Sequence, residues 1–248
     1  MSEQAPPPYE PVDEDWQTAL AVVAHPDDME YGAAAAVARW TGQGKRVVYV
    51  MATRGEAGID GMDPDEAARV RTAEQIASAA VVGVDTVEFL DFPDGVIEYG
   101  LPLRRAIARS VRQHRPDVVI TTNFRDTYGG VFPNQADHIA VGRAALDGVR
   151  DAGNRWVFRD LAESEGLAPW NGVRLLLAAG SPAAAHAVDT TAHFDLGVAS
   201  LKEHKAYLDG LGGAMAQPDE FLESFGRMAG SRLGTTYAAA FEVIRLTM

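Results

Sequence analysis

Residues 18–30 read TALAVVAHPDDME, an apolar run that ends abruptly in one imidazole and several carboxylates. The run of small and branched apolar residues lacks polar alternation, which is typical of a short strand buried on both faces of a parallel sheet. We therefore predict a strand over residues 18–25, followed by an Ala-rich helix from Glu30 to Trp40. Because open parallel sheets bind ligands beyond the carboxyl ends of their strands, the polar residues after this strand are candidates for a functional site.

The same order of strand and helix repeats along the first 150 residues. Further strands are predicted at residues 46–53, 85–92 and 117–124, and further helices at residues 64–82, 101–114 and 134–150. Asp63 is suited to cap the helix that begins at Pro64. This alternation predicts an α/β fold with a mainly parallel sheet and helices on both faces.

The second half of the chain is less regular. Candidate strands lie at residues 173–179, 185–189 and 235–246, and a candidate helix lies at residues 195–208. Residues 1–16 are polar and Pro-rich, which predicts an arm ahead of a single domain over residues 17–248. The sequence lacks the GxGxxG fingerprint of dinucleotide-binding folds.

The composition limits the partners of the protein. The chain has 248 residues and a formal net charge of −13, which argues against nucleic acid and anionic membranes as partners. No apolar run approaches the ~18–20 residues of a membrane-spanning helix, and the N-terminus lacks the features of a signal peptide. We therefore expect a cytoplasmic protein with a small-molecule substrate, and self-association is compatible with this composition. Because the chain has no cysteine, any metal must be held by nitrogen and oxygen ligands.

The segment from His25 to Asp28 carries the strongest chemical signal. Pro26 favours extended geometry at His25, so we expect His25 and Asp28 to point the same way from a tight turn and Asp27 to point elsewhere. A His and a carboxylate at this spacing can form half of a catalytic zinc site, which a ligand from another loop would complete. The alternative is that His25 ends the strand while the aspartates cap the next helix. Adjacent carboxylates repel each other unless a cation or solvent compensates, which favours the metal site.

This segment and others resemble the PIG-L / LmbE-like family of zinc-dependent de-N-acetylases. AHPDDME matches the family signature AHPDDxE, and the resemblance continues in order through TRGEAG (53–58), RTAE (71–74), FPDG (92–95), RPDVVIT (115–121) and DH (137–138). The combined order and spacing make the resemblance specific, although each segment alone would be weak. It implies a Rossmann-like fold and a metal-dependent amide hydrolase.

The resemblance also assigns roles to individual residues. It implies that His25, Asp28 and His138 bind Zn²⁺, although another divalent metal such as iron or nickel could enter the same ligands. It further implies that Asp27 is the general base. Asp137 is expected to hydrogen-bond to one of the ligand histidines, because such second contacts orient metal ligands.

Arg71 and Asp94 are similar to the family residues that hold the sugar. They are expected to bind sugar hydroxyls or to fix nearby side chains. An equally simple alternative for Arg71 is an ion pair with Glu74, three residues further along the same helix.

The sequence departs from the family at Gln135. The family usually has a histidine there, three residues before its last metal ligand. Glutamine can donate a hydrogen bond but cannot carry a proton at neutral pH, so either Asp27 performs both proton transfers or a histidine from the second half replaces the missing one. His204 is the candidate for that second role, because some family members bring a C-terminal histidine toward the substrate pocket.

We therefore expect a zinc-dependent hydrolase that removes an N-acyl group, most simply N-acetyl, from an N-acetylglucosamine-type glycoside or a glycosylated small metabolite. Two alternatives stay open, an amidase that acts on a sugar–thiol conjugate and a metal- or sugar-binding module with decayed catalysis. Retention of Asp27 together with all three candidate ligands speaks against decay, while Gln135 speaks for it.

Overall fold

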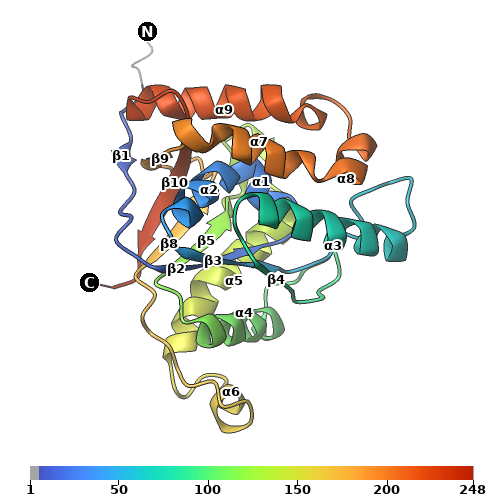
Figure 1. Ribbon diagram of the computed structural model, residues 1–248. Coiled ribbons are helices and arrows are strands. Elements are labelled where there is room, and N and C mark those ends of the chain that lie inside the picture. The colour runs from blue at the N-terminus through green and yellow to red at the C-terminus, as the bar shows by residue number, and fades with distance from the viewer. Residues whose placement is uncertain (1–5, 248) are drawn as a thin grey trace.

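Eight strands form the central sheet of the computed structural model, which describes residues 6–247 of the chain (Figure 1). In spatial order they are β1 (Glu10–Pro11), β9 (His186–Asp189), β10 (Ala238–Arg245), β8 (Leu175–Ala179), β5 (Val118–Thr122), β2 (Thr18–Val23), β3 (Arg46–Met51) and β4 (Thr86–Phe89). Strand β10 runs antiparallel to both of its neighbours, and all other pairs in this sheet are parallel. A small separate hairpin consists of β6 (Thr127–Tyr128) and β7 (Phe132–Pro133). The predicted mainly parallel α/β fold is confirmed.

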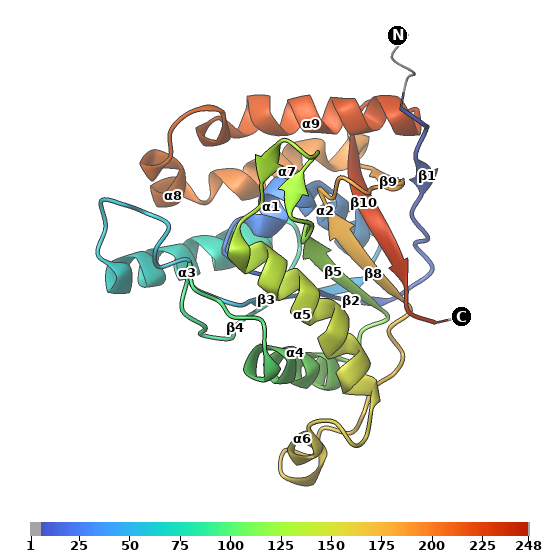
Figure 2. The same cartoon turned by 180° about the vertical axis from the view of Figure 1, so that it is seen from behind.

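Helices cover both faces of the sheet, and two apolar clusters fill the layers between (Figures 1 and 2). One face carries α1 (Asp28–Gly32), α2 (Ala34–Gly42), α3 (Pro64–Val81), α7 (Phe194–Lys202), α8 (Lys205–Gly210) and α9 (Pro218–Leu233), and the other face carries α4 (Leu101–His114), α5 (Ala136–Gly153) and α6 (Arg159–Glu163). Short 3₁₀ turns are η1 (Thr191–His193) and η2 (Ala214–Ala216).

The strand residues alternate between these two clusters. Ala19, Ala21 and Val23 of β2 pack into one, while Leu20 and Val22 pack into the other. Both faces of β2 are therefore buried, which explains why its sequence is apolar at every position.

Three helices differ from the sequence expectation. The predicted helix from Glu30 to Trp40 is two helices, because the chain breaks at Ala33, whose φ is −148°. The predicted helix at residues 195–208 is likewise divided into α7 and α8. Helix α9 was not predicted, although Pro218 stands at its start and Gly234 ends it with a φ of 87°; both are recognised helix boundary signals. No helix within residues 6–247 is long and apolar enough to cross a membrane.

The predicted N-terminal arm is not separate from the domain over residues 10–16. Strand β1 pairs with β9 at the edge of the sheet, and Val12 and Trp16 are buried. The Trp16 ring packs edge-on against the ring of Trp40 at 5.2 Å between centroids, and Glu14 pairs with Arg39 at 2.9 Å. The expected boundary at residue 16 therefore does not match the packing, while residues 1–5 of the expected arm lie outside the described residues.

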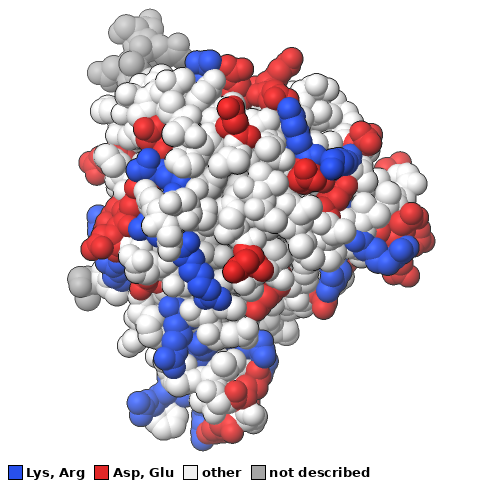
Figure 3. All heavy atoms as spheres, viewed as in Figure 1, with Lys and Arg blue, Asp and Glu red and all other residues white. Residues whose placement is uncertain are grey.

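Charged side chains are interspersed over the face of the molecule shown in Figure 3. Many of them form exposed pairs of opposite sign, such as Lys202 with Asp219 at 2.7 Å. Such surface pairs contribute little to stability, so the fold depends mainly on the two apolar layers.

Candidate active site

The candidate site lies where the strand order of the sheet reverses. From β2 the chain proceeds to β3 and β4 on one side, and then returns to β5 and β8 on the other side of β2. A crevice forms beyond the carboxyl ends of the strands at such a switch point, and ligands bind there in open α/β sheets. His25 and Asp28 follow β2 directly, and His138 lies in the first turn of α5 after β5.

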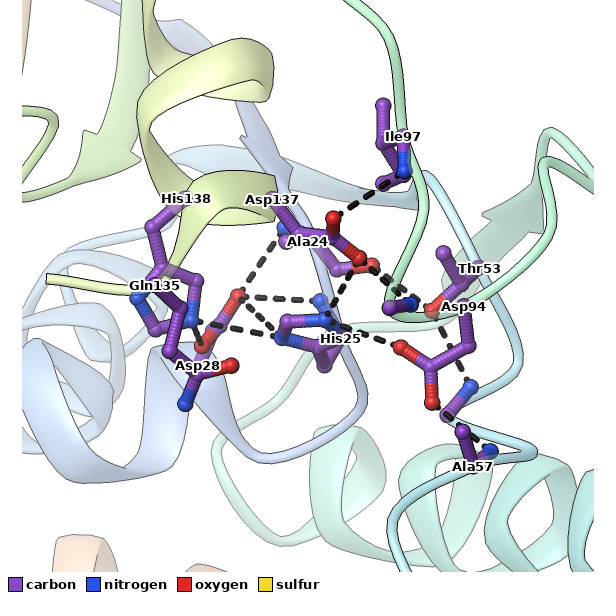
Figure 4. Close-up of polar contacts among 12 residues, drawn as sticks. Ala24, His25, Asp28, Thr53, Ala57, Asp94, Ile97, Gln135, Asp137 and His138 are labelled. Atoms are coloured by element: carbon purple, nitrogen blue, oxygen red, sulfur yellow. Dashed lines mark hydrogen bonds and ion pairs between the residues drawn. The ribbon is translucent and has the colours of Figure 1, made fainter.

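Three side chains converge at this point, as the sequence predicted (Figure 4). His138 Nε2 lies 3.0 Å from Asp28 Oδ1, and His25 Nδ1 lies 3.2 Å from His138 Nε2. The second carboxylate oxygen of Asp28 accepts hydrogen bonds from the backbone N–H groups of Ala24 and His25, each at 2.9 Å. All three side chains are buried, so their positions are fixed by packing as well as by hydrogen bonds.

In each histidine, the ring nitrogen that points away from Asp28 has an acceptor as its partner. His25 Nε2 lies 3.0 Å from Asp94 and 3.3 Å from Asp137, and a carboxylate can only accept, so this nitrogen carries the proton. His138 Nδ1 lies 3.0 Å from Asn134 Oδ1, which likewise accepts. Once a metal ion replaces the remaining protons, the two nitrogens that face Asp28 are consequently the ones that can offer lone pairs.

This donor set fits a divalent metal ion. Two imidazole lone pairs and one carboxylate oxygen point toward a common centre, with the ligand atoms within 4.8 Å of one another. Three protein ligands with a remaining open position are the arrangement of catalytic zinc. A second group formed by His25, Asp94 and Asp137 uses the proton-bearing nitrogen of the same His25, so those carboxylates orient the ligand rather than form another centre.

The pKa values of His25 and Asp28 are shifted by the opposite charges that face each other in this centre. Burial alone would lower the pKa of His25, but hydrogen bonds to Asp137 and Asp94 and the charge of Asp28 raise it to about 10. Burial would raise the pKa of the Asp28 carboxyl, but His138 and His25 hold it well below its usual value. The centre therefore attracts positive charge, supplied by protons or by a metal ion.

The two carboxylates around His25 are held by backbone N–H groups. Asp137 accepts hydrogen bonds from Gly95 at 2.7 Å and from Ile97 at 3.0 Å, and Asp94 accepts one from Ala57 at 2.8 Å. Asp137 contacts a histidine of the candidate centre as expected, but this histidine is His25 and not the adjacent His138. Asp94 contacts His25 in the way expected of a residue that fixes a neighbouring side chain, and its contact with a sugar stays a prediction.

Asp27 points to a different set of partners than Asp28. Its backbone is left-handed, with φ at 95°, a conformation that L residues adopt mainly where the surrounding structure imposes it. One carboxylate oxygen of Asp27 lies 3.2 Å from Arg71 Nη2, and the backbone N–H of Asp27 donates to Gln75 Oε1 at 3.0 Å. Burial raises the pKa of the Asp27 carboxyl although Arg71 opposes that shift, so Asp27 binds a proton more readily than an ordinary aspartate.

Arg71 contacts the Asp27 carboxylate and two backbone carbonyl groups. Its guanidinium donates to the carbonyl oxygens of Gly55 at 2.8 Å and Pro26 at 2.6 Å, and a Cβ at Gly55 or Gly58 would overlap it. The two glycines of the TRGEAG segment therefore make room for the Arg71 side chain. The alternative ion pair with Glu74 is not what holds Arg71, and direct contact between Arg71 and a sugar stays a prediction.

Gln135 stands at the N-terminal end of α5, where its side chain is exposed at the rim of the site (Figure 4).

Sequence reasoning missed two neighbours of His138, Asn134 and Tyr128, which both contact His138 Nδ1, at 3.0 Å and 3.2 Å. The four-residue spacing of Asn134 and His138 was a usable signal, because such residues are neighbours around the start of a helix. Tyr128 comes from the β6–β7 hairpin, and no sequence signal pointed to it.

His204 does not contact the open side of the site. It is fully buried, and its Nε2 lies 3.6 Å from Glu30 Oε2, which is also fully buried. The prediction that His204 binds substrate disagrees with this burial, because no part of the ring is accessible. The physical reason is that the chain breaks between α7 and α8 and directs His204 inward, toward Glu30.

The sequence model described as GlcNAc-PI de-N-acetylase, PIG-L, matches residues 20–149. The diacetylchitobiose deacetylase of Thermococcus kodakarensis is 31% identical to the chain over 56% of its length and 51% of the relative's length. The 1D-myo-inositol 2-acetamido-2-deoxy-alpha-D-glucopyranoside deacetylase of Kineococcus radiotolerans is 35% identical over 54% of the chain and 47% of the relative. The chain thus aligns with about half the length of these curated relatives.

Two solved structures share the fold over nearly the whole chain. N,N'-diacetylchitobiose deacetylase from Pyrococcus horikoshii superposes with a TM-score of 0.84 at 21% identity, covering 94% of this chain and 85% of that one. The 4-carboxy-2-hydroxymuconate hydratase GalB from Pseudomonas putida superposes with a TM-score of 0.74 at 19% identity, covering 94% and 98%. Because a deacetylase and a hydratase both have this fold, the fold does not determine the reaction.

Proposed function

Because the chain belongs to the GlcNAc-PI de-N-acetylase (PIG-L) family, we propose that it is a cytoplasmic, zinc-dependent hydrolase that removes an N-acetyl group from an amino-sugar derivative. One observation carries the proposal. The lone pairs of His25 and His138 and the carboxylate of Asp28 converge, and a second carboxylate, Asp27, stands next in the sequence with separate partners. These residues suit a metal centre with an adjacent base, a combination that supports hydrolysis of an amide.

His25, Asp28 and His138 would hold the metal. A bound zinc ion lowers the pKa of a coordinated water and polarises the acyl carbonyl. Asp94, Asp137 and Asn134 keep the two imidazoles in the tautomers and orientations that this binding needs. Zinc is preferred because two imidazoles and one carboxylate form a borderline-soft ligand set.

Asp27 would accept the proton of the attacking water as the C–O bond forms. It would then deliver that proton to the amide nitrogen as the C–N bond breaks, which releases the free amine and the carboxylic acid. Arg71 keeps the carboxylate in place, and the pKa of Asp27 is raised by burial, so the protonated intermediate state is accessible. One residue can perform both transfers, and Gln135 then needs only to donate a hydrogen bond.

The substrate class is proposed from what the two aligned relatives have in common. Their names specify diacetylchitobiose and an inositol glycoside of 2-acetamido-2-deoxy-glucopyranose as substrates. Both contain an N-acetylglucosamine unit. We expect such a unit, free or linked to a small metabolite, to be the substrate here.

The decisive experiment measures acetate and free amine released by the zinc-loaded full chain. The panel would contain N,N'-diacetylchitobiose, the N-acetylglucosaminyl inositol and a sugar–thiol amide. Equal amounts of acetate and amine from either N-acetylglucosamine compound, lost on chelation and restored by zinc, are the expected result. Hydrolysis of the thiol conjugate alone would identify an amidase instead, and no hydrolysis at full metal occupancy would identify a binding module.

A further inference from the structure

The segment that follows α7 reaches the surroundings of Asp27 from outside the matched residues 20–149. Helix α8 lies against α3 in Figure 1. Helix α3 supplies Arg71, which pairs with the Asp27 carboxylate, and Gln75, which accepts a hydrogen bond from the Asp27 backbone N–H. The residues of α8 therefore pack against the helix that carries the two partners of the proposed base.

Tyr207 is the residue of α8 that makes this contact. Its ring lies under the Arg71 guanidinium, with the guanidinium carbon 4.1 Å from the ring centroid. Burial raises the pKa of the Tyr207 hydroxyl, and the neighbouring Asp27 carboxylate raises it further. The hydroxyl thus stays protonated, and Tyr207 contacts the Arg71–Asp27 pair through its ring, which supports one face of the guanidinium.

A fully buried pair anchors the start of α8. His204 immediately precedes the helix, and its Nε2 faces Glu30 Oε2 at 3.6 Å. The other Glu30 oxygen accepts hydrogen bonds from Gln75 at 3.0 Å and Ser78 at 2.8 Å. Among the described residues, Glu30 Oε2 and both ring nitrogens of His204 have no hydrogen-bond partner, so the pair is held by its opposite charges. Separating it would leave a charge buried alone, and the pair therefore ties the end of α7 to α1 and α3.

A second contact fixes the first turn of α8. The backbone N–H of Ala206 donates to Glu74 Oε1 at 2.6 Å. This N–H belongs to the group at a helix start that has no partner within the helix, so Glu74 satisfies it from α3. Both anchors lie within three residues before Tyr207 and fix the start of the helix from which it projects.

We propose that His204, Ala206 and Tyr207 form a positioning arm for the general base, in which the two anchors hold α8 and Tyr207 holds the Arg71–Asp27 pair. This inference rests on the proposed function. Tyr207 is a positioning residue rather than a catalytic one. Without the Tyr207 ring the Arg71 guanidinium keeps its backbone hydrogen bonds but loses the support of one face, so the orientation of the paired Asp27 carboxylate is less constrained. Proton transfer depends on that orientation, while substrate and metal binding do not.

The test compares Tyr207→Leu with the matched variant Tyr9→Leu in the full, zinc-loaded chain. Tyr9 also packs against a guanidinium, that of Arg232 at 3.6 Å, but it lies at the far edge of the sheet. We expect Tyr207→Leu to lower kcat roughly tenfold, the size of a partly desolvated cation–π contact, with KM and metal content unchanged. Tyr9→Leu should leave all three unchanged. Equal kcat in both variants, or a loss confined to KM, would overturn the role of Tyr207.

The anchors are tested without using activity. Hydrogen exchange of the backbone amides of residues 205–211 would be measured in His204→Gln and in Glu74→Ala, the second being a mild change to a good helix former. We expect faster exchange there in both variants and unchanged exchange in residues 101–114. Unchanged exchange at residues 205–211 would refute the anchoring even if no substrate were found, which separates this failure from failure of the proposed reaction.

Discussion

The carboxylate of Asp137 lies 3.3 Å from Nε2 of His25 and not beside His138, its neighbour in the sequence. A residue of α5 thus orients the ligand that follows β2, while His138 is oriented by Asn134 and Tyr128. The His25 half of the centre is therefore held partly by the helix that carries His138. The centre can keep its shape only when β2 and α5 are docked correctly.

Loss of either histidine should empty the metal centre. His25→Ala and His138→Ala each remove one of three ligands, and the remaining two are insufficient for a stable catalytic site. Metal content measured by plasma mass spectrometry should fall to a small fraction of the wild-type value. The matched control is His186→Ala, which lies in β9 and pairs only with Glu10 at the sheet edge and should keep full occupancy. Full retention of metal in both ligand variants would refute the assignment.

Metal binding should strengthen as the pH rises. The raised pKa of His25, about 10 without metal, means that a metal ion must displace a proton over the whole neutral range, which weakens binding at lower pH by about tenfold per unit for each proton displaced. The effect on metal-free stability has the opposite sign, because a raised pKa contributes stability below pH 6.5 that is lost as the pH approaches 10. Titration calorimetry and thermal unfolding of the metal-free chain measure the two trends. A zinc affinity that does not change between pH 6 and 8 would contradict the proton displacement.

Asp27→Asn should keep the metal and the fold but lose most of the activity. Asparagine tolerates a left-handed backbone, so the φ of 95° at this position is preserved, but the amide cannot accept the proton of water. The loss of kcat should be about 10²- to 10⁴-fold, the usual contribution of a general base. Circular dichroism and metal content serve as the controls. Wild-type turnover by this variant on the true substrate would exclude Asp27 as the base.

Gln135→Ala should lower turnover without changing the shape of the pH profile. If Gln135 donates a hydrogen bond to the oxyanion or substrate, its removal costs about 10²- to 10³-fold in rate, and no titrating group is lost with it. Gln135→His should be tolerated and should add a limb on the basic side as the imidazole deprotonates. The comparison requires kcat measured from pH 5 to 10. Full activity of Gln135→Ala would show that the exposed amide at the rim has no part in catalysis.

Trp16→Ala should destabilise the fold strongly, because the residue is 2% exposed and packs against Trp40. Truncation of a buried tryptophan costs about 3–5 kcal/mol in the free energy of unfolding, which urea unfolding would measure. Trp156→Ala is the control, since Trp156 is 71% exposed and its loss should change stability by no more than about 0.5 kcal/mol. Equal stability of the two variants would mean that residues 10–16 do not contribute to the packed domain.

The sequence predicted the site residues that come shortly after a predicted strand or within a recognised motif. His25, Asp28 and His138 are brought together because the carboxyl ends of neighbouring parallel strands meet at one edge. The partners of Arg71 could not be predicted, because they depend on how the loop after β3 folds back onto α3. His204 and Tyr207 were harder still, since their direction depends on a helix break that leaves no clear signal.

The packing of residues 10–16 was missed for a different reason. Prolines and acidic residues dominate the composition of the N-terminal segment, so its average polarity conceals two buried side chains, Val12 and Trp16. A pairing of only two residues, Glu10–Pro11 with β9, gives no detectable periodicity. Such an edge strand can be recognised only from the sheet that it joins.

The pairing of β1 with β9 has a consequence for the order of events during synthesis. Glu10 meets His186, a residue made much later, whereas β2, β3, β4 and β5 and the ligands His25, Asp28 and His138 all precede residue 150. As the chain leaves the ribosome, the half with the proposed metal ligands can therefore assemble while the edge of the sheet and α8 are still being translated. Under the proposed function, metal capture would then come before Tyr207 packs against Arg71, so a nascent chain could acquire its ion before its proposed base is fully positioned.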